Sequence, residues 1–198
     1  MKITTPCNAL VLACLFLAGS LGLARAADGS IGYFDTVKND PFPETGKEYY
    51  LRHNIMYERD AWDSTNYWRG TLAAVNTKVR LLGLGGRKLV VQLADEGVII
   101  NVSVSRHTKQ PLNELARALL APKPVPVEKY SAEMQEAIKA GMPKTGMTKE
   151  QVVIARGYPP AHKTPSLKSS SWLYWNSKFV THRFAFTDDV LTAARGVE

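Results

Sequence analysis

Residues 146–160 read GMTKEQVVIARGYPP and hold a complete helix with a marked start and a marked end. Thr148 and Gln151 have the spacing of a capping box, in which each side chain satisfies a backbone amide that the helix leaves unpaired. Gly157 is placed to end the helix in a left-handed turn, and the two prolines after Tyr158 cannot continue a helix. The stretch therefore predicts one short helix that begins after Thr148 and stops at Gly157.

Three segments rich in apolar residues follow this helix. Segments 171–175, 178–186 and 190–194 predict three strands joined by short polar turns. In the first of them, Trp172 and Tyr174 are two positions apart and so lie on the same face of the strand. We interpret the aromatic side chains of these strands as the core of a sheet rather than as a platform for a ligand.

A further helix precedes the capping box. Ser131 can cap its start, and Gly141 ends it. The order helix, helix, strand, strand, strand predicts an αα-βββ module over residues 128–198. In its simplest form, one face of a three-stranded antiparallel sheet packs on the two helices.

This module resembles the SmpA/OmlA (BamE-like) domain family over about residues 138–196. The matching motifs are, in order, Gly146-Met-Thr148, Gly157-Tyr-Pro159, Trp172-Leu-Tyr174, Phe184-Ala-Phe186 and Asp188. The resemblance implies an αα-βββ fold and a non-enzymatic role as a scaffold or binding module in the Gram-negative envelope, where such domains serve outer-membrane assembly. A similar fold in secreted inhibitors of β-lactamases implies protein recognition as an alternative. We carry over no binding residue from the family.

The segment before the module has a different character. Residues 121–127 read APKPVPV, and their alternating prolines predict an extended interdomain linker. Residues 47–120 are β-rich and predict a small barrel or meander, of SH3-like type, with one helix from Pro111 to Leu120. Its clearest strands are 77–82, 89–93 and 98–104, the first two joined by a turn at Gly85-Gly86. The whole chain is therefore predicted to be an α+β protein.

The N-terminus has the features of a cleavable signal peptide over residues 1–26. Lys2 precedes a long apolar run, and Ala24-Arg25-Ala26 gives the small-x-small pattern of a signal peptidase site. A membrane anchor and lipidation at Cys14 are the alternatives. Residues 27–46 carry turn-forming residues and predict a flexible lead. We therefore expect a periplasmic protein, which lipidation would attach to the outer membrane.

The charge of the chain restricts its partners. The 198 residues carry a net charge of +7, with 25 basic and 18 acidic side chains. The basic residues are scattered, whereas nucleic-acid binding would require a basic patch, so we expect no nucleic-acid partner. A positive surface is compatible with an acidic protein of the envelope as partner, and also with cell-wall polymer or anionic lipid.

Motifs for catalysis or for a cofactor are missing from the sequence. No Gly-x-Ser-x-Gly elbow and no His-Glu-x-x-His motif occurs, and both cysteines lie in the predicted signal peptide. His53, His107, His162 and His182 are far apart in sequence, and we expect them to be lone surface residues. We therefore predict no catalytic, cofactor-binding or metal-binding residue, and no enzymatic activity.

The proline-rich loop 157–165 is the best candidate for a contact surface. A stiff loop loses little conformational entropy when it binds a partner. We predict contact residues at Tyr158, Pro160 and His162. The function that this organisation favours is that of an exported, non-enzymatic binding or scaffold protein of the bacterial cell envelope. The alternatives are a cell-wall-polymer binder that acts through the N-terminal module, or an inhibitor-like recognition module.

Overall fold

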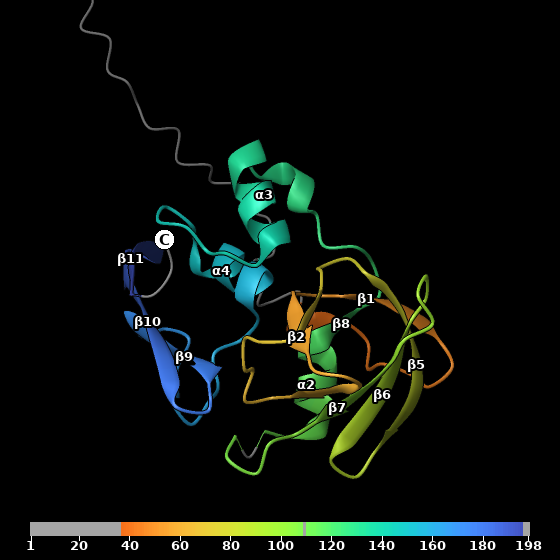
Figure 1. The fold of residues 1–198 in the computed structure, drawn as a ribbon. Coiled ribbons are helices and arrows are strands. Elements are labelled where there is room, and N and C mark those ends of the chain that lie inside the picture. Colours follow the sequence, from red (N-terminus) through yellow and green to blue (C-terminus); the bar gives the residue numbers. More distant parts are fainter. Residues whose placement is uncertain (1–36, 109, 196–198) are drawn as a thin grey trace, which may run out of the picture. The chain divides into compact units, whose positions relative to one another are not determined.

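The computed structural model describes residues 37–108 and 110–195 of the chain. The predicted signal peptide and residues 27–36 of the predicted lead lie outside this range. The described residues form a mixed α+β structure with few helices and several sheets, as expected (Figure 1). None of its helices combines the length and the apolar character that a membrane span requires.

The larger sheet has six strands in the order β3-β7-β6-β5-β1-β8. Strands β5, β6 and β7 form an antiparallel meander, which confirms the three strands predicted in this region, while β3 joins the edge of the sheet parallel to β7. The sheet contains β1 (Glu48–Leu51), β3 (Ala61–Asp63), β5 (Lys78–Gly85), β6 (Lys88–Leu93), β7 (Ile99–Ser103) and β8 (Leu120–Ala121), and a separate antiparallel pair consists of β2 (Ile55–Tyr57) and β4 (Thr71–Ala73).

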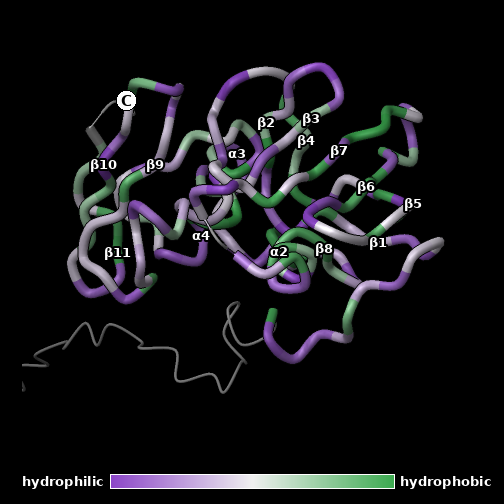
Figure 2. Tube along the Cα trace, turned by 90° about the horizontal axis from the view of Figure 1, so that it is seen from below, coloured by the Kyte–Doolittle hydropathy of each residue, from purple (hydrophilic) through white to green (hydrophobic). Residues whose placement is uncertain are grey.

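Helix α2 (Leu112–Leu119) packs against this sheet. Its buried residues include Leu115, Ala116 and Leu119, and they join the core cluster that the inward side chains of β5 and β6 form. Figure 2 shows hydrophobic positions gathered at α2 and β8. Pro111 stands at the N-cap, one position before the helix rather than in its first turn as predicted, and its missing N–H costs the helix no hydrogen bond there.

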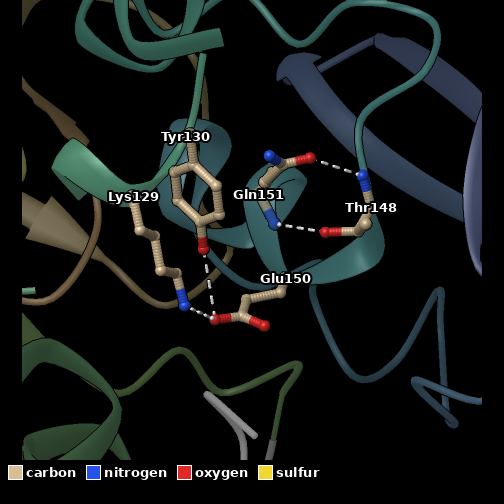
Figure 3. Close-up of polar contacts among 5 residues, drawn as sticks. All are labelled: Lys129, Tyr130, Thr148, Glu150 and Gln151. Atoms are coloured by element: carbon tan, nitrogen blue, oxygen red, sulfur yellow. Dashed lines mark hydrogen bonds and ion pairs between the residues drawn. The ribbon is translucent and has the colours of Figure 1, made fainter. Parts of the chain in front are cut away.

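Helices α3 (Ala132–Ala140) and α4 (Lys149–Arg156) have the predicted caps. At the start of α4, the Thr148 hydroxyl accepts from the Gln151 amide at 3.3 Å, and the Gln151 side chain accepts from the Thr148 amide at 2.8 Å (Figure 3). The end of α4 differs from the prediction in one respect. Gly157 has a positive φ of 77°, but its ψ of −179° directs the chain into an extended segment rather than into a left-handed helical turn.

The smaller sheet is an antiparallel meander in the order β11-β10-β9, as predicted. Trp172, Tyr174 and Phe184 have no exposed surface and form one core cluster with residues of α3 and α4. The interpretation as a core is therefore confirmed for these three side chains, but it is wrong for Phe179, which is 85% exposed, and Trp175 is only half-buried. The strands are β9 (Ser171–Ser177), β10 (Val180–Thr187) and β11 (Val190–Arg195), and a short 3-10 helix, η1 (Val127–Lys129), precedes α3.

The C-terminal ends of α3 and α4 accept hydrogen bonds from the side chains of Asn54 and Asn66, which precede β2 and β4 in the chain. The Asn54 amide donates to the carbonyl of Ile138 at 2.5 Å and to that of Ala155 at 2.9 Å. The Asn66 amide donates to the carbonyl of Arg156 at 2.8 Å. Because the last carbonyls of a helix lack partners within the helix, these asparagines satisfy the carbonyls of Ala155 and Arg156. The Ile138 carbonyl also accepts from the Gly141 amide at 3.0 Å.

The proline-rich segment 121–127 is held by one side chain. The Asn76 side chain accepts from the Val125 amide at 2.7 Å and donates to the Val125 carbonyl at 2.8 Å. Val125 is buried in the same cluster as α3 and α4. The division of the chain into two modules with a linker stays a prediction.

Candidate functional site

The loop after α4 has a fixed conformation. Two prolines restrict its backbone, and the Lys163 amide donates to the Pro160 carbonyl at 2.9 Å. The Thr164 hydroxyl then accepts from the Leu173 amide of β9 at 2.9 Å, and it also lies 3.4 Å from the Leu173 carbonyl. At the start of the loop, the Tyr174 hydroxyl donates to the Gly157 carbonyl at 2.8 Å, so the loop is anchored at both ends and in its middle.

The three predicted contact residues differ in exposure. Pro160 is buried, Tyr158 is half-buried, and His162 is exposed. The ring of Tyr158 points its edge toward His53, with the centroids 5.8 Å apart. His162 therefore lies on the outer side of the loop, while Tyr158 and Pro160 lie toward the rest of the molecule. Their contact with a partner stays a prediction.

A cleft of about 660 Å³ lies between this loop and helix α2. Leu115 and Ala118 line it from the helix, and Tyr158 and Pro165 line it from the loop segment. Trp62 of β3 contributes a further apolar surface. Ligand sites have volumes of roughly 300–1,000 Å³ and mostly apolar walls with a few polar groups, and the cleft has this character.

His53 is a buried titratable group of the cleft lining, and its pKa is strongly shifted. It is only 2% exposed, and its Nδ1 lies 2.8 Å from the Asn54 carbonyl, which can only accept, so Nδ1 carries the proton. Burial lowers its pKa to about 4, and the neighbouring Arg52 acts in the same direction. The ring is therefore neutral at pH 7, with a lone pair on Nε2. The expectation of a surface histidine is wrong at this position.

Arg117 brings a positive charge to the cleft from the last turn of α2. Its Nε is buried, and no described residue accepts a hydrogen bond from it. Glu114 precedes it by one turn of the helix and also lines the cleft, but the two side chains form no ion pair in the described structure. The Arg117 guanidinium lies instead 5.9 Å from the ring centroid of Phe42.

Two hydroxyl groups of the cleft, those of Ser64 and Thr108, contact each other. The Ser64 hydroxyl lies 2.8 Å from that of Thr108 and accepts from the Ser105 amide at 2.9 Å. In the part of the chain that the structure covers, no hydrogen bond links Ser64 to His53. The hydroxyl is therefore not placed for activation by the imidazole, which a serine nucleophile would need. The contacts of the cleft suit recognition of a ligand.

A second group of aromatic and basic side chains lies on the outer side of the loop. Trp175 donates from its indole nitrogen to His162 Nε2 at 3.3 Å, and the two rings are stacked. The ring centroids of His162 and His107 are 6.0 Å apart, so these two histidines are neighbours rather than lone residues. Partial burial lowers the pKa of His162, and Lys163 and His107 lower it further. Across residues 37–108 and 110–195, no group of three or more His, Cys, Asp or Glu is arranged to hold a metal ion.

Sequence reasoning missed the residues of the cleft apart from Tyr158. Residues 52–54 read Arg-His-Asn between apolar strands, and all three are buried. A polar triplet between two apolar segments is typical of a solvated turn. This one is buried only because helices from later in the chain pack on it. Arg117 gives no signal either, because a basic residue in the last turn of a helix is ordinary.

Comparison of the chain with family models, curated proteins and solved structures gives no match.

Proposed function

We propose that this chain is an exported, non-enzymatic binding or scaffold protein of the bacterial cell envelope, which resides in the periplasm and contacts an envelope protein. The signal-peptide pattern of residues 1–26 supports export. The motif series from Gly146 to Asp188 supports the envelope role through its resemblance to the SmpA/OmlA family. The order of α3, α4, β9, β10 and β11 is consistent with a BamE-like module, and we assign an SH3-like character to the N-terminal sheet as part of the same proposal.

The observation that carries the proposal is the construction of the loop 157–165. Its backbone is fixed by two prolines and by Thr164, while His162 and Lys163 are exposed on its outer side. A surface that is rigid before binding loses little entropy when a partner docks. In this proposal His162 makes the direct contact, Tyr158 supports it from the inner side, and Pro160 sets the course of the loop.

Site-specific photocrosslinking in cells tests this contact. A photoreactive phenylalanine analogue replaces His162 in one variant and Lys123, an exposed residue of the proline-rich segment, in the control. We expect a crosslinked envelope protein with the first variant and a much weaker band with the second. Equal bands, or no band with either variant although both proteins reach the envelope, would contradict a partner at this loop.

Intact mass and fractionation test the export. An unmodified chain that starts at Ala27, in the soluble periplasmic fraction, is the expected result. A lipidated chain that starts at Cys14 in the outer membrane would replace the predicted cleavage site and bring the protein closer to the family that it resembles. A chain that retains Met1 in the cytoplasm would refute the proposal.

Binding of cell-wall polymer is the second candidate function. Tyr67 of the N-terminal segment and Trp175 of β9 are half-buried, and their ring centroids are 6.2 Å apart. Such a pair of aromatic faces could take the apolar face of a sugar ring. Sedimentation with purified peptidoglycan distinguishes this function, since the wild-type protein would sediment and Trp175→Ala would not.

A further inference from the structure

The cleft beside α2 has an elongated apolar wall. Pro111, Leu115 and Ala118 all line it, and they are spaced four and three positions apart, so they lie along one face of the helix. At a rise of 1.5 Å per residue, this row is about 10 Å long. Trp62 and Leu167 add apolar surface from other segments. The wall therefore fits an extended apolar group that lies along the helix.

Arg117 gives the cleft a polar atom that lacks a hydrogen-bond acceptor. Its Nε is buried and has no acceptor among the described residues, although a buried N–H without an acceptor is unfavourable. Glu114 lines the same cleft, but its side chain is exposed to solvent, whereas Arg117 is half-buried. A ligand in the cleft therefore meets mainly the positive charge of Arg117, and arginine is the residue best suited to a carboxylate.

We propose that the cleft binds a single-chain amphiphile with an anionic head, of the fatty-acid class. The apolar chain lies along Pro111, Leu115 and Ala118, and the carboxylate accepts from the Arg117 guanidinium. His53 is neutral and does not compete for the carboxylate. This site lies on the inner side of the loop 157–165 and does not depend on the partner proposed for the outer side.

Calorimetric titration of the exported full chain with dodecanoate, below its micelle concentration, tests the site. We expect saturable binding by the wild-type protein. Arg117→Gln should weaken it by about tenfold, since it removes one charge-assisted hydrogen bond. Lys123→Gln removes the same charge from an exposed position outside the cleft and should leave the affinity unchanged. The neutral methyl ester should bind weakly to all three proteins.

Two variants that fill the cleft complete the test. Ala118→Phe places a ring on the helical wall, and Ala161→Trp places one at an exposed position of the lining, where folding is not at risk. Both substitutions should abolish binding of dodecanoate. If Ala118→Phe does not fold, the result with Ala161→Trp alone tests the site. The proposal is overturned if wild-type protein does not bind dodecanoate, if the folded filled variants bind it as well as wild type does, or if Arg117→Gln has no effect.

Discussion

At the scale of single residues, His53 makes the stability of the protein dependent on pH. Its pKa is about 4 in the folded protein, against an ordinary value of 6.5. Between these values the unfolded chain binds a proton that the folded protein does not, so the free energy of unfolding falls as the pH falls through this window. At 1.36 kcal/mol per pH unit, His53 alone lowers it by roughly 3 kcal/mol once the pH is below 4.

Urea unfolding of the wild type and of His53→Gln, from about pH 7 to about pH 4, measures this contribution. The free energy of unfolding should fall more steeply for the wild type than for the variant. Other groups that titrate in this range are present in both proteins and cancel in the difference. Parallel curves would show that His53 is not buried as a neutral ring.

The sequence does not reveal the environment of such residues. Arg52, His53 and Asn54 are buried because segments more than sixty positions later in the chain cover them, as the hydrogen bonds to Arg117 and Ala155 show. No pattern of neighbouring residues indicates contacts between residues this far apart in the sequence. Tyr158 was found because it follows a helix end and precedes a proline pair, which are local features.

At the scale of elements, the capping box sets the start of α4. Thr148→Ala removes the acceptor of the Gln151 amide and should lower the free energy of unfolding by about 1 kcal/mol. Thr148→Ser keeps the hydroxyl and should lose much less. Thermal unfolding followed by circular dichroism compares the two variants. Equal losses would mean that the methyl group of Thr148 matters rather than its hydroxyl.

The elements with strong local signals are the ones that the sequence predicts. Helices α2, α3 and α4 have caps or an apolar face, and the longer strands alternate in polarity. Strands β2, β3 and β4 have three residues each and were not predicted. Three residues are too few to show a period of two, so pairing with distant strands determines them.

At the scale of the whole molecule, Gly141 allows the end of α3 to approach the N-terminal segment. A Cβ atom at this position would lie 2.4 Å from Cζ2 of the half-buried Trp68. Gly141 has φ 68° and Gly97 has φ 69°, but Gly97 has open space around it. Both alanine variants suffer the strain of a left-handed backbone, which is roughly 1 kcal/mol. Gly141→Ala suffers the clash as well.

We therefore expect Gly141→Ala to be less stable than Gly97→Ala by about 1–3 kcal/mol, the usual effect of overpacking. Chemical denaturation of both variants measures the difference. Gly141→Ala combined with Trp68→Ala should remove the clash and restore part of the loss. Equal stability of the two single variants would contradict the close approach of Trp68.

The side chain of Asn54 forms hydrogen bonds with three backbone groups. Asn54→Ala leaves the carbonyls of Ile138 and Ala155 and the amide of Val75 without this partner, which should lower the free energy of unfolding by about 3 kcal/mol. Asn101→Ala removes an exposed amide and should change it by less than about 0.5 kcal/mol. Urea denaturation compares the two, and similar values would show that water replaces the Asn54 amide.

The partners of Asn54 also determine when the chain can complete its fold. They lie 84 and 101 positions later in the sequence, so the hydrogen bonds close long loops. Loops of this length form late, because much chain entropy is lost before the contact forms. The N-terminal strands leave the ribosome long before the residues that carry these carbonyls are synthesised. The nascent protein therefore reaches its full stability only after synthesis has passed Ala155, and a chain that stops before α3 should be open to proteases.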